Sequence, residues 1–469
     1  MPDVFAEKLP LELVSYIFEF VLYGWYTDYW SFALSRLQLM RTSPFFLYLI
    51  LHSPELWSLV MVSPRLPVQA TETILGRSGS LPLDLLMHFH ESHFKSKSGL
   101  RNLATYGVES IVTTRLQAVI QHLHRWKSLR VEADHTPSFL HLRRLLCAVA
   151  PPDLRRFTFV VLASSPLSPT NWLQGRLDHV EELSIFSTSM MWSALPPLLC
   201  LRRLRIDTTS PEHHPTFAVM RRLIETSPLL QYLGLRYTGC DMSGVDAATA
   251  TITSSSITHL NVNFAAFLAP RTTPFHALRC PNLIHVTLAV HKERDVADAV
   301  ACAHVFRSAS SLKLSTVALS RDTSLDMVYD IFDRLTSLDL LNCEPDIVLR
   351  LIRSSEARMS GGVTYFLPHL ETVTFDCVEL PLIRRFGILH GVSIEGASVA
   401  LRHVRATIYP SKVDADADGE RIIYWLAAQL VKFDNMYQPV DPVVVRTYLK
   451  NVQWNKFGLP FGKYAPFSY

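Results

Sequence analysis

The sequence predicts an α/β protein in which a helical N-terminal domain is followed by a long solenoid with parallel strands inside and helices outside. Three observations lead to this prediction. A frame of apolar residues recurs along most of the 469-residue chain, helix-like stretches separate its copies, and the N-terminal segment has helical periodicity. Because one strand-and-helix unit cannot cover its own apolar side, we expect the units to stack on one another.

The clearest copy of the frame is residues 335–343, which read L-x-x-L-x-L-x-x-C. Leu338 and Leu340 are two residues apart, so in an extended chain both side chains point to the same side. Leu335 leads into the strand, and Cys343 is small and apolar enough to be buried where the chain turns away. We therefore expect a buried strand here, with a neighbouring unit on either side.

The reduced frame, apolar-x-x-apolar-x-apolar, occurs many times in one register. Its copies are residues 126–131, 154–159, 180–185, 201–206, 230–235, 257–262, 283–288, 309–314, 335–340 and 370–375, with a weaker copy at 401–406. The steps between Val262, Leu288, Leu314 and Leu340 are 26 residues each. This regularity favours stacked repeats over the alternative, a set of unrelated buried strands in an α/β domain.

The pattern resembles the leucine-rich repeat, whose units are about 20–29 residues long. Between the frames, apolar residues at helical spacing predict helices. These stretches are residues 113–126, 139–149, 217–225, 295–306, 325–335 and 345–354. The resemblance implies an irregular leucine-rich-repeat solenoid, with strands lining its hollow side and helices on the outside.

Composition and charge narrow the class of protein. Hydrophobic residues make up 48% of the chain and charged residues 19%, as in globular rather than disordered proteins. The formal charge of +3 is too small to predict a nucleic-acid partner. The seven cysteines are scattered and form no C-x-x-C, which favours reduced thiols and a cytoplasmic or nuclear location. We expect neither a signal peptide nor a membrane segment, because polar residues interrupt the apolar residues 44–62.

Residues 9–22 predict an amphipathic helix. Pro10 suits the first turn, where its missing N–H costs nothing. One apolar stripe consists of Leu9, Leu13, Ile17 and Val21, and the stripe beside it consists of Val14, Phe18 and Leu22. A helix with apolar residues on adjacent faces can pack one face internally and offer the other to a partner.

Three N-terminal segments resemble the F-box family. They are L-P-x-E-L-x-x-x-I-F at residues 9–18, L-Q-L-M-R at 37–41 followed by two phenylalanines, and S-P-E-L-W at 53–57. R-S-G-S-L-P-L follows at 77–83, as in many fungal F-box proteins, and H-R-W-K-S-L-R at 124–130 begins the repeats. The resemblance implies an F-box-like domain at 1–62, a connecting segment at 63–112, a solenoid at 113–410 and a C-terminal helix and aromatic cap at 411–469.

The resemblance also implies a function without catalysis by this chain. The F-box would dock on a Skp-family adaptor of a cullin–RING ubiquitin ligase, and the repeats would hold a protein target near a ubiquitin-charged enzyme. The expected adaptor-binding residues are Leu9, Pro10, Leu13, Ile17 and Phe18. The alternative interpretation of residues 9–57 is a helical cap for the first repeat of a scaffold that never joins a ligase.

Residues between the buried strand positions are expected to point to the hollow side and to bind the target. The candidates are Arg130, Arg156, Arg203, Arg205, Tyr232, His259 and His285, together with Asn261 and Lys313. The early units are rich in arginine, which would suit an acidic or phosphorylated segment. The alternative is that these side chains only keep the strands soluble.

Two motifs suggest metal chemistry but are incomplete. His88, His90 and His93 have a spacing that suits zinc, which leaves a metal-dependent hydrolase as a third hypothesis. Residues 414–419 read D-A-D-A-D-G like the start of a calcium loop, but Trp425 occupies the twelfth position, where such a loop needs a glutamate. No nucleophile motif or phosphate-binding glycine loop occurs. We therefore expect no enzyme activity, no cofactor and no metal.

Overall fold

The computed structural model describes much of the chain from the first helical turn onward. The described residues are 10, 13–14, 16–18, 29–90, 105–134, 136–148, 151–161, 177, 179–186, 192, 195–207, 214–236, 250–263, 274–290, 292–316, 325–340, 346–360, 367, 369–375, 380–389, 401–406 and 432–435. The chain forms two compact units. The first unit is Met1–His214 with Thr226–Leu229, and the second is Pro215–Glu225 with Leu230–Tyr469.

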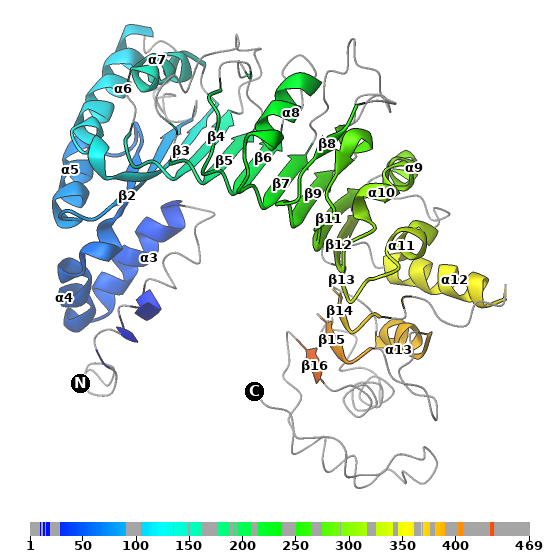
Figure 1. Cartoon of the computed structure of the whole chain (residues 1–469). Coiled ribbons are helices and arrows are strands. Elements are labelled where there is room, and N and C mark those ends of the chain that lie inside the picture. Colours follow the sequence, from blue (N-terminus) through cyan, green and yellow to red (C-terminus); the bar gives the residue numbers. More distant parts are fainter. Residues whose placement is uncertain are drawn as a thin grey trace. The chain divides into compact units, whose positions relative to one another are not determined.

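The first unit contains a parallel sheet whose strands follow one another in sequence order (Figure 1). Its strands are β1 (Leu59–Val62), β2 (Leu83–Phe89), β3 (Trp126–Ala133), β4 (Arg156–Val161), β5 (Glu182–Phe186) and β6 (Arg203–Asp207). The repeated frame predicts that its final apolar residues pair across neighbouring strands. In the structure Val131 pairs with Phe159, and Phe159 with Ile185. The predicted strands of this unit, and the way they stack, are confirmed.

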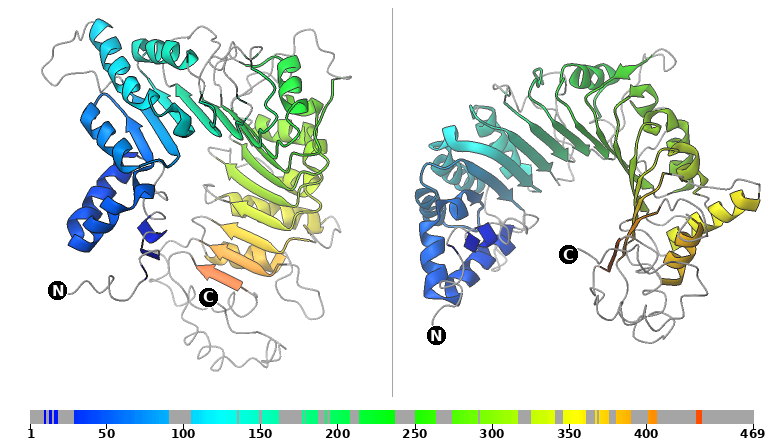
Figure 2. Two further views of the ribbon diagram at one scale, coloured as in Figure 1. Left: turned by 60° about the vertical axis from the view of Figure 1, so that its left-hand side comes forward. Right: turned by 60° about the horizontal axis from the view of Figure 1, so that its bottom comes forward.

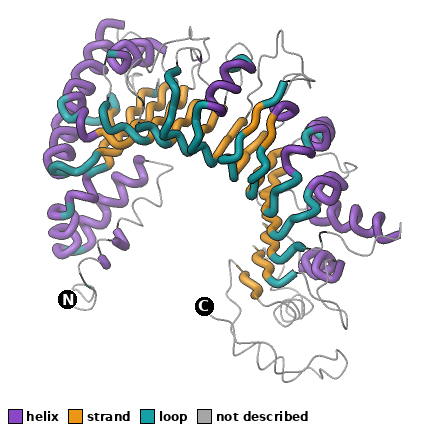
Figure 3. Tube along the Cα trace, in the orientation of Figure 1, coloured by secondary structure: helices purple, strands orange, loops and turns teal. Residues whose placement is uncertain are grey.

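Helices of the first unit pack on the sheet and on one another. They are α3 (Tyr29–Thr42), α4 (Pro44–His52), the 3-10 turn η1 (Pro54–Trp57), α5 (Val68–Arg77), α6 (Thr105–Ile120), the 3-10 turn η3 (Leu123–Arg125) and α7 (Thr136–Cys147). Figure 3 shows helices beside the strands where Figure 1 labels α5, α6 and α7. Frame residues of these strands, such as Leu129 and Val131, are buried. The strand-and-helix alternation expected from the sequence is therefore present.

The parallel sheet begins earlier than the boundary expected at residue 113. β1 and β2 pair with each other, and β2 pairs with β3, so the sheet includes residues of the predicted helical domain and of the predicted connecting segment. β1 follows the same frame from Trp57, with Val60 and Val62 at the buried positions. This strand is only four residues long and lies within a long apolar stretch, so no alternation of apolar and polar residues marks it in the sequence.

The starts of β1 and β3 are built alike. The indole Nε1–H of Trp57 donates to the Ile50 carbonyl at 2.6 Å, and that of Trp126 donates to the Val119 carbonyl at 3.2 Å. In both cases the acceptor lies seven residues earlier, in the helix that precedes the strand. A helix, a 3-10 turn and a tryptophan therefore lead into a strand twice in this unit.

Two buried arginines donate hydrogen bonds to residues of the N-terminal motifs. The buried Arg36 donates to the Leu56 carbonyl at 3.0 Å and lies over the Trp57 ring. Arg125, also buried, donates to the Leu81 carbonyl at 2.8 Å and to the Ser78 hydroxyl at 2.7 Å. The S-P-E-L-W and R-S-G-S-L-P-L segments thus supply backbone acceptors for buried guanidinium groups, which is a structural role for both motifs.

The second unit continues the same construction with further parallel strands. Its strands, in order, are β7 (Tyr232–Arg236), β9 (His259–Asn263), β11 (His285–Val290), β12 (Ser311–Thr316), β13 (Ser337–Leu340), β14 (Thr372–Phe375), β15 (His403–Ala406) and β16 (Lys432–Asn435). Val262 pairs with Leu288, and Leu288 with Leu314, as the 26-residue steps predict. Figure 2 shows these strands from two further directions.

The remaining elements of the second unit agree with most of the expected helices. They are α8 (Phe217–Glu225), α9 (Glu293–Ala301), α10 (Ala303–Phe306), α11 (Asp326–Ile331), α12 (Asp346–Ser360) and α13 (Leu380–Leu389), with a 3-10 turn η8 (Pro274–Ala277). A second, two-stranded parallel sheet joins β8 (Ile252–Thr253) and β10 (Leu278–Arg279). The stretch expected as one helix at 295–306 is two helices, separated at Cys302.

The repeat also extends further than expected at the C-terminal side. β16 pairs with β15, with Phe433 beside Val404 and Asn435 beside Ala406. Because a polar asparagine occupies the last frame position, the apolar frame does not find this strand. The helix expected at 421–431 lies outside the described residues, as does most of the predicted cap.

The core consists of the frame residues stacked strand upon strand. Leu314 is fully buried between Leu288 and Leu340, which are its partners on the two neighbouring strands. Burying one such side chain stabilises the fold by about 1.5–3 kcal/mol. On strands such as β5 and β11, residues on the opposite side stay at least partly exposed, as their alternating burial shows. This second side is called the exposed strand face below.

Candidate functional site

A helical turn starts at the predicted position near the N-terminus. The backbone N–H groups of Leu13 and Val14 donate to the Pro10 carbonyl at 3.0 and 3.2 Å. Leu13, Val14 and residues 16–18 are helical. Leu9, the first of the expected adaptor-binding residues, lies outside the described residues.

The two apolar stripes of this segment have different environments. Val14 and Phe18 are buried, with 2% and 5% of their surface exposed. The Phe18 ring packs edge-on against Phe46 of α4, with the ring centroids 4.9 Å apart. Leu13 and Ile17 remain 49% and 45% exposed. Phe18 therefore lies on the internal stripe and holds the helix in place, whereas Leu13 and Ile17 are accessible to a partner.

Exposed apolar side chains concentrate in the N-terminal helical segment. Among the described residues, this segment holds six of the ten large hydrophobic side chains that are strongly exposed. They are Leu13, Tyr16, Ile17, Leu37, Leu47 and Tyr48, and we call them the N-terminal apolar face. Single exposed hydrophobic residues are ordinary, but such a concentration in one segment is typical of an interaction surface.

The expected arginines do lie on the exposed strand face of the first unit. Arg156 and Arg203 occupy one row across the strands, on either side of Glu182. Arg130 and Arg205 occupy the next row, with Thr158 and Ser184 between them. The period-two alternation therefore placed all four side chains correctly.

These arginines are matched by acidic or aromatic partners. Arg156 pairs with Asp84 at 2.9 Å, and the Ser128 hydroxyl donates to the same carboxylate oxygen at 2.5 Å. Arg203 lies 3.9 Å from Glu182. The guanidinium carbon of Arg205 lies 4.7 Å from the ring centroid of Phe186. Acceptors for the arginines are thus already present within the same face.

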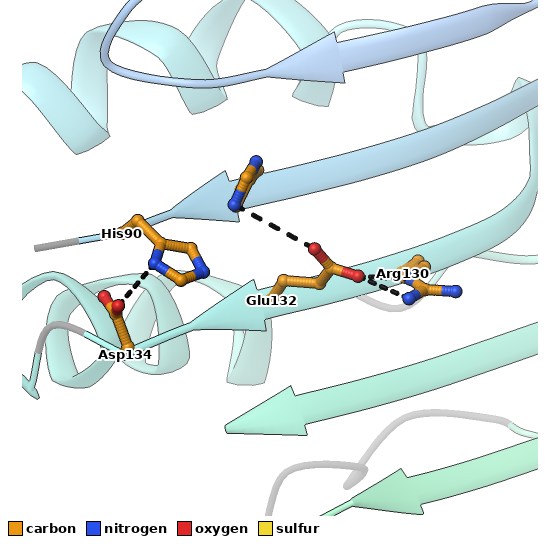
Figure 4. Close-up of polar contacts among 5 residues, drawn as sticks. His90, Arg130, Glu132 and Asp134 are labelled. Carbon is orange, nitrogen blue, oxygen red and sulfur yellow. Dashed lines mark hydrogen bonds and ion pairs between the residues drawn. The ribbon is translucent and has the colours of Figure 1, made fainter. Parts of the chain in front are cut away.

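A denser polar network occupies the C-terminal ends of β2 and β3 (Figure 4). Arg130 donates to Glu132 at 2.6 Å, and the other Glu132 oxygen lies 4.0 Å from His88 Nε2. His90 forms an ion pair with Asp134, and the rings of His88 and His90 meet edge to face at 4.7 Å. Burial lowers the pKa of His88, and the nearby Glu132 opposes that shift in part.

This network is not the zinc site that the third hypothesis, a metal-dependent hydrolase, requires. Among the described residues, no group of three histidine, cysteine or acidic side chains is arranged to hold a metal ion. His88 and His90 instead contact carboxylates of the neighbouring strand, and His93 lies outside the described part of the chain. The calcium-like run at 414–419 also lies outside it.

Charge on the exposed strand face of the first unit is balanced rather than basic. Its four arginines are accompanied by Asp84, Glu132, Asp134, Glu182 and Asp207. The basic surface inferred from the arginines alone is therefore not formed, because Asp84 and Glu182 share the row of Arg156 and Arg203 and the other acidic residues lie in further rows of the same face. The sequence already contains these acids, but only the register shows that they are neighbours of the arginines.

The exposed strand face of the second unit has a different composition. Tyr232, His259 and His285 lie side by side on β7, β9 and β11. The two imidazole rings are stacked with centroids 4.4 Å apart and an interplanar angle of 28°. The Asn261 amide donates to the Tyr232 hydroxyl at 3.0 Å and fixes the phenol beside them. These three target-binding candidates form one cluster, separate from the four arginines.

Two cations accompany this cluster. Lys313 on β12 is exposed, and Arg236 ends β7 on the same face. Arg236 was not among the sequence candidates because it lies one step beyond the six-residue frame. The same alternation, extended by two residues past Gly234, would have found it.

The described cysteines are free thiols. Cys280 and Cys302 are buried and Cys200 is partly buried. Burial raises the pKa of Cys280 to about 12, so its thiol stays protonated at neutral pH. Within the described ranges, no helix has both the length and the apolar character needed to cross a membrane.

Comparisons with known proteins add little to this geometry. No protein-family model matches the chain, and no curated protein sequence matches it. Among solved structures, a protein from Bacteroides fragilis is similar over 73% of this chain and 74% of its own, with 10% identity and a TM-score of 0.27. A similarity at that level identifies neither a fold nor a function.

Proposed function

We propose that this protein is the substrate-recognition subunit of a cullin–RING ubiquitin ligase. In this proposal the N-terminal apolar face docks on a Skp-family adaptor, and the exposed strand faces hold a protein target. The leucine-rich-repeat-like solenoid is then a spacer that presents the target to a ubiquitin-charged enzyme. The chain contributes proximity and no chemistry of its own.

One observation carries the proposal. The helix that starts at Pro10 buries Val14 and Phe18 but leaves Leu13 and Ile17 about half exposed. Nearly half of each of these two aliphatic side chains faces water, although the fold has a large apolar core in which to bury them. A partner that covers them would recover the hydrophobic free energy that the isolated chain does not use.

The proposal is tested by co-purification with the adaptor. Replacing both side chains in a Leu13→Ser/Ile17→Ser variant should weaken adaptor retention by about tenfold or more, because apolar anchors dominate such interfaces. The unfolding midpoint should change little, since surface substitutions cost within about 0.5 kcal/mol. Retention is measured by quantitative pull-down from a mixture of purified proteins.

A matched control separates docking from general loss of hydrophobic surface. Leu199 and Leu229 are also strongly exposed but lie far along the chain from the N-terminal helices. A Leu199→Ser/Leu229→Ser variant should retain the adaptor like the wild type. If the wild type fails to bind the adaptor, or if both double variants lose it equally, the docking proposal is wrong.

A second candidate is a repeat scaffold that never joins a ligase. It is favoured by the way in which α4 and η1 lead into β1 through Trp57, as α6 and η3 lead into β3 through Trp126. This likeness is what a helical cap for the first repeat would give. Recovery of the adaptor without any cullin, or of neither protein, would select the scaffold over the ligase subunit.

A further inference from the structure

We draw no further inference here: the strongest candidate, the exposed stripe of α4 that carries Leu47 and Tyr48, belongs to the N-terminal apolar face already proposed as the docking surface, and nothing in the described part of the chain shows what other partner would cover it.

Discussion

The surroundings of His88 lower its pKa, and this shift makes the stability of the fold depend on pH. Its ring lies between His90 and Glu132 at the end of β2, and burial is the main cause that lowers its pKa below 6.5. Glu132 and Asp134 oppose that shift, whereas His90 and Arg65 add to it. Protonation of His88 is therefore harder in the folded chain than in the unfolded one.

This shift gives a pH dependence with a definite sign. Below about pH 6.5 the unfolded chain takes up a proton at His88 more readily than the folded chain, so the free energy of unfolding falls as the pH decreases. Above that pH the contribution of His88 is constant. Urea midpoints of the wild type should therefore decline between about pH 7 and pH 5, and a His88→Gln variant should decline less. Parallel pH profiles of the two proteins would contradict the assignment to His88.

The sequence does not predict which individual residues pair with one another. The two-residue alternation indicates that Arg156 points to the exposed strand face, and it does. Its partner Asp84 is 72 residues earlier in the chain. That contact depends on the register of three strands and on the existence of β2. The sequence could therefore predict which residues share the face, but not that acids neutralise its arginines.

At the scale of the element, the apolar frame determines which strand positions are buried. Leu312 and Leu314 of β12 are fully buried, and Lys313 between them is exposed. The frame anticipates this pattern because strand side chains alternate with a period of two. It also anticipates register, because shifting one strand by a single residue would expose every frame residue on it.

A pair of substitutions on one strand tests this interpretation. Leu314→Ala should lower the free energy of unfolding by about 2–5 kcal/mol, because it leaves a cavity between Leu288 and Leu340. Lys313→Ala, one residue away, should change it by no more than about 0.5 kcal/mol. The measurement is equilibrium denaturation followed by circular dichroism. Similar losses from both substitutions would show that Lys313 does not lie on an exposed face.

Three strands of the large parallel sheet are not recognisable from the sequence, each for an identifiable reason. β1 is short and buried throughout, so no polar residues outline it within the apolar residues 44–62. β2 starts at Leu83 with a shifted register against Trp126, which breaks the frame at its first position. β16 ends on Asn435 where an apolar residue is expected. In each case pairing with a neighbouring strand supplies what the local pattern lacks.

At the scale of the molecule, the proposed adaptor-binding surface lies within one compact unit. Leu13 and Ile17 belong to the first unit, whereas Arg236 and Lys313 on the exposed strand face belong to the second. Contact free energies of residues that share no partners usually add, so substitutions on the strand face of the second unit should not change docking through Leu13 and Ile17.

This division predicts that substitutions in the second unit spare docking. Leu13→Ser/Ile17→Ser should lose adaptor retention, whereas Arg236→Glu/Lys313→Glu should retain the adaptor like the wild type. High salt should also spare the adaptor complex, because screening acts on charges and not on buried apolar contacts. Loss of adaptor retention in Arg236→Glu/Lys313→Glu, measured by the same pull-down and with the unfolding midpoint unchanged, would mean that docking is not confined to the N-terminal apolar face.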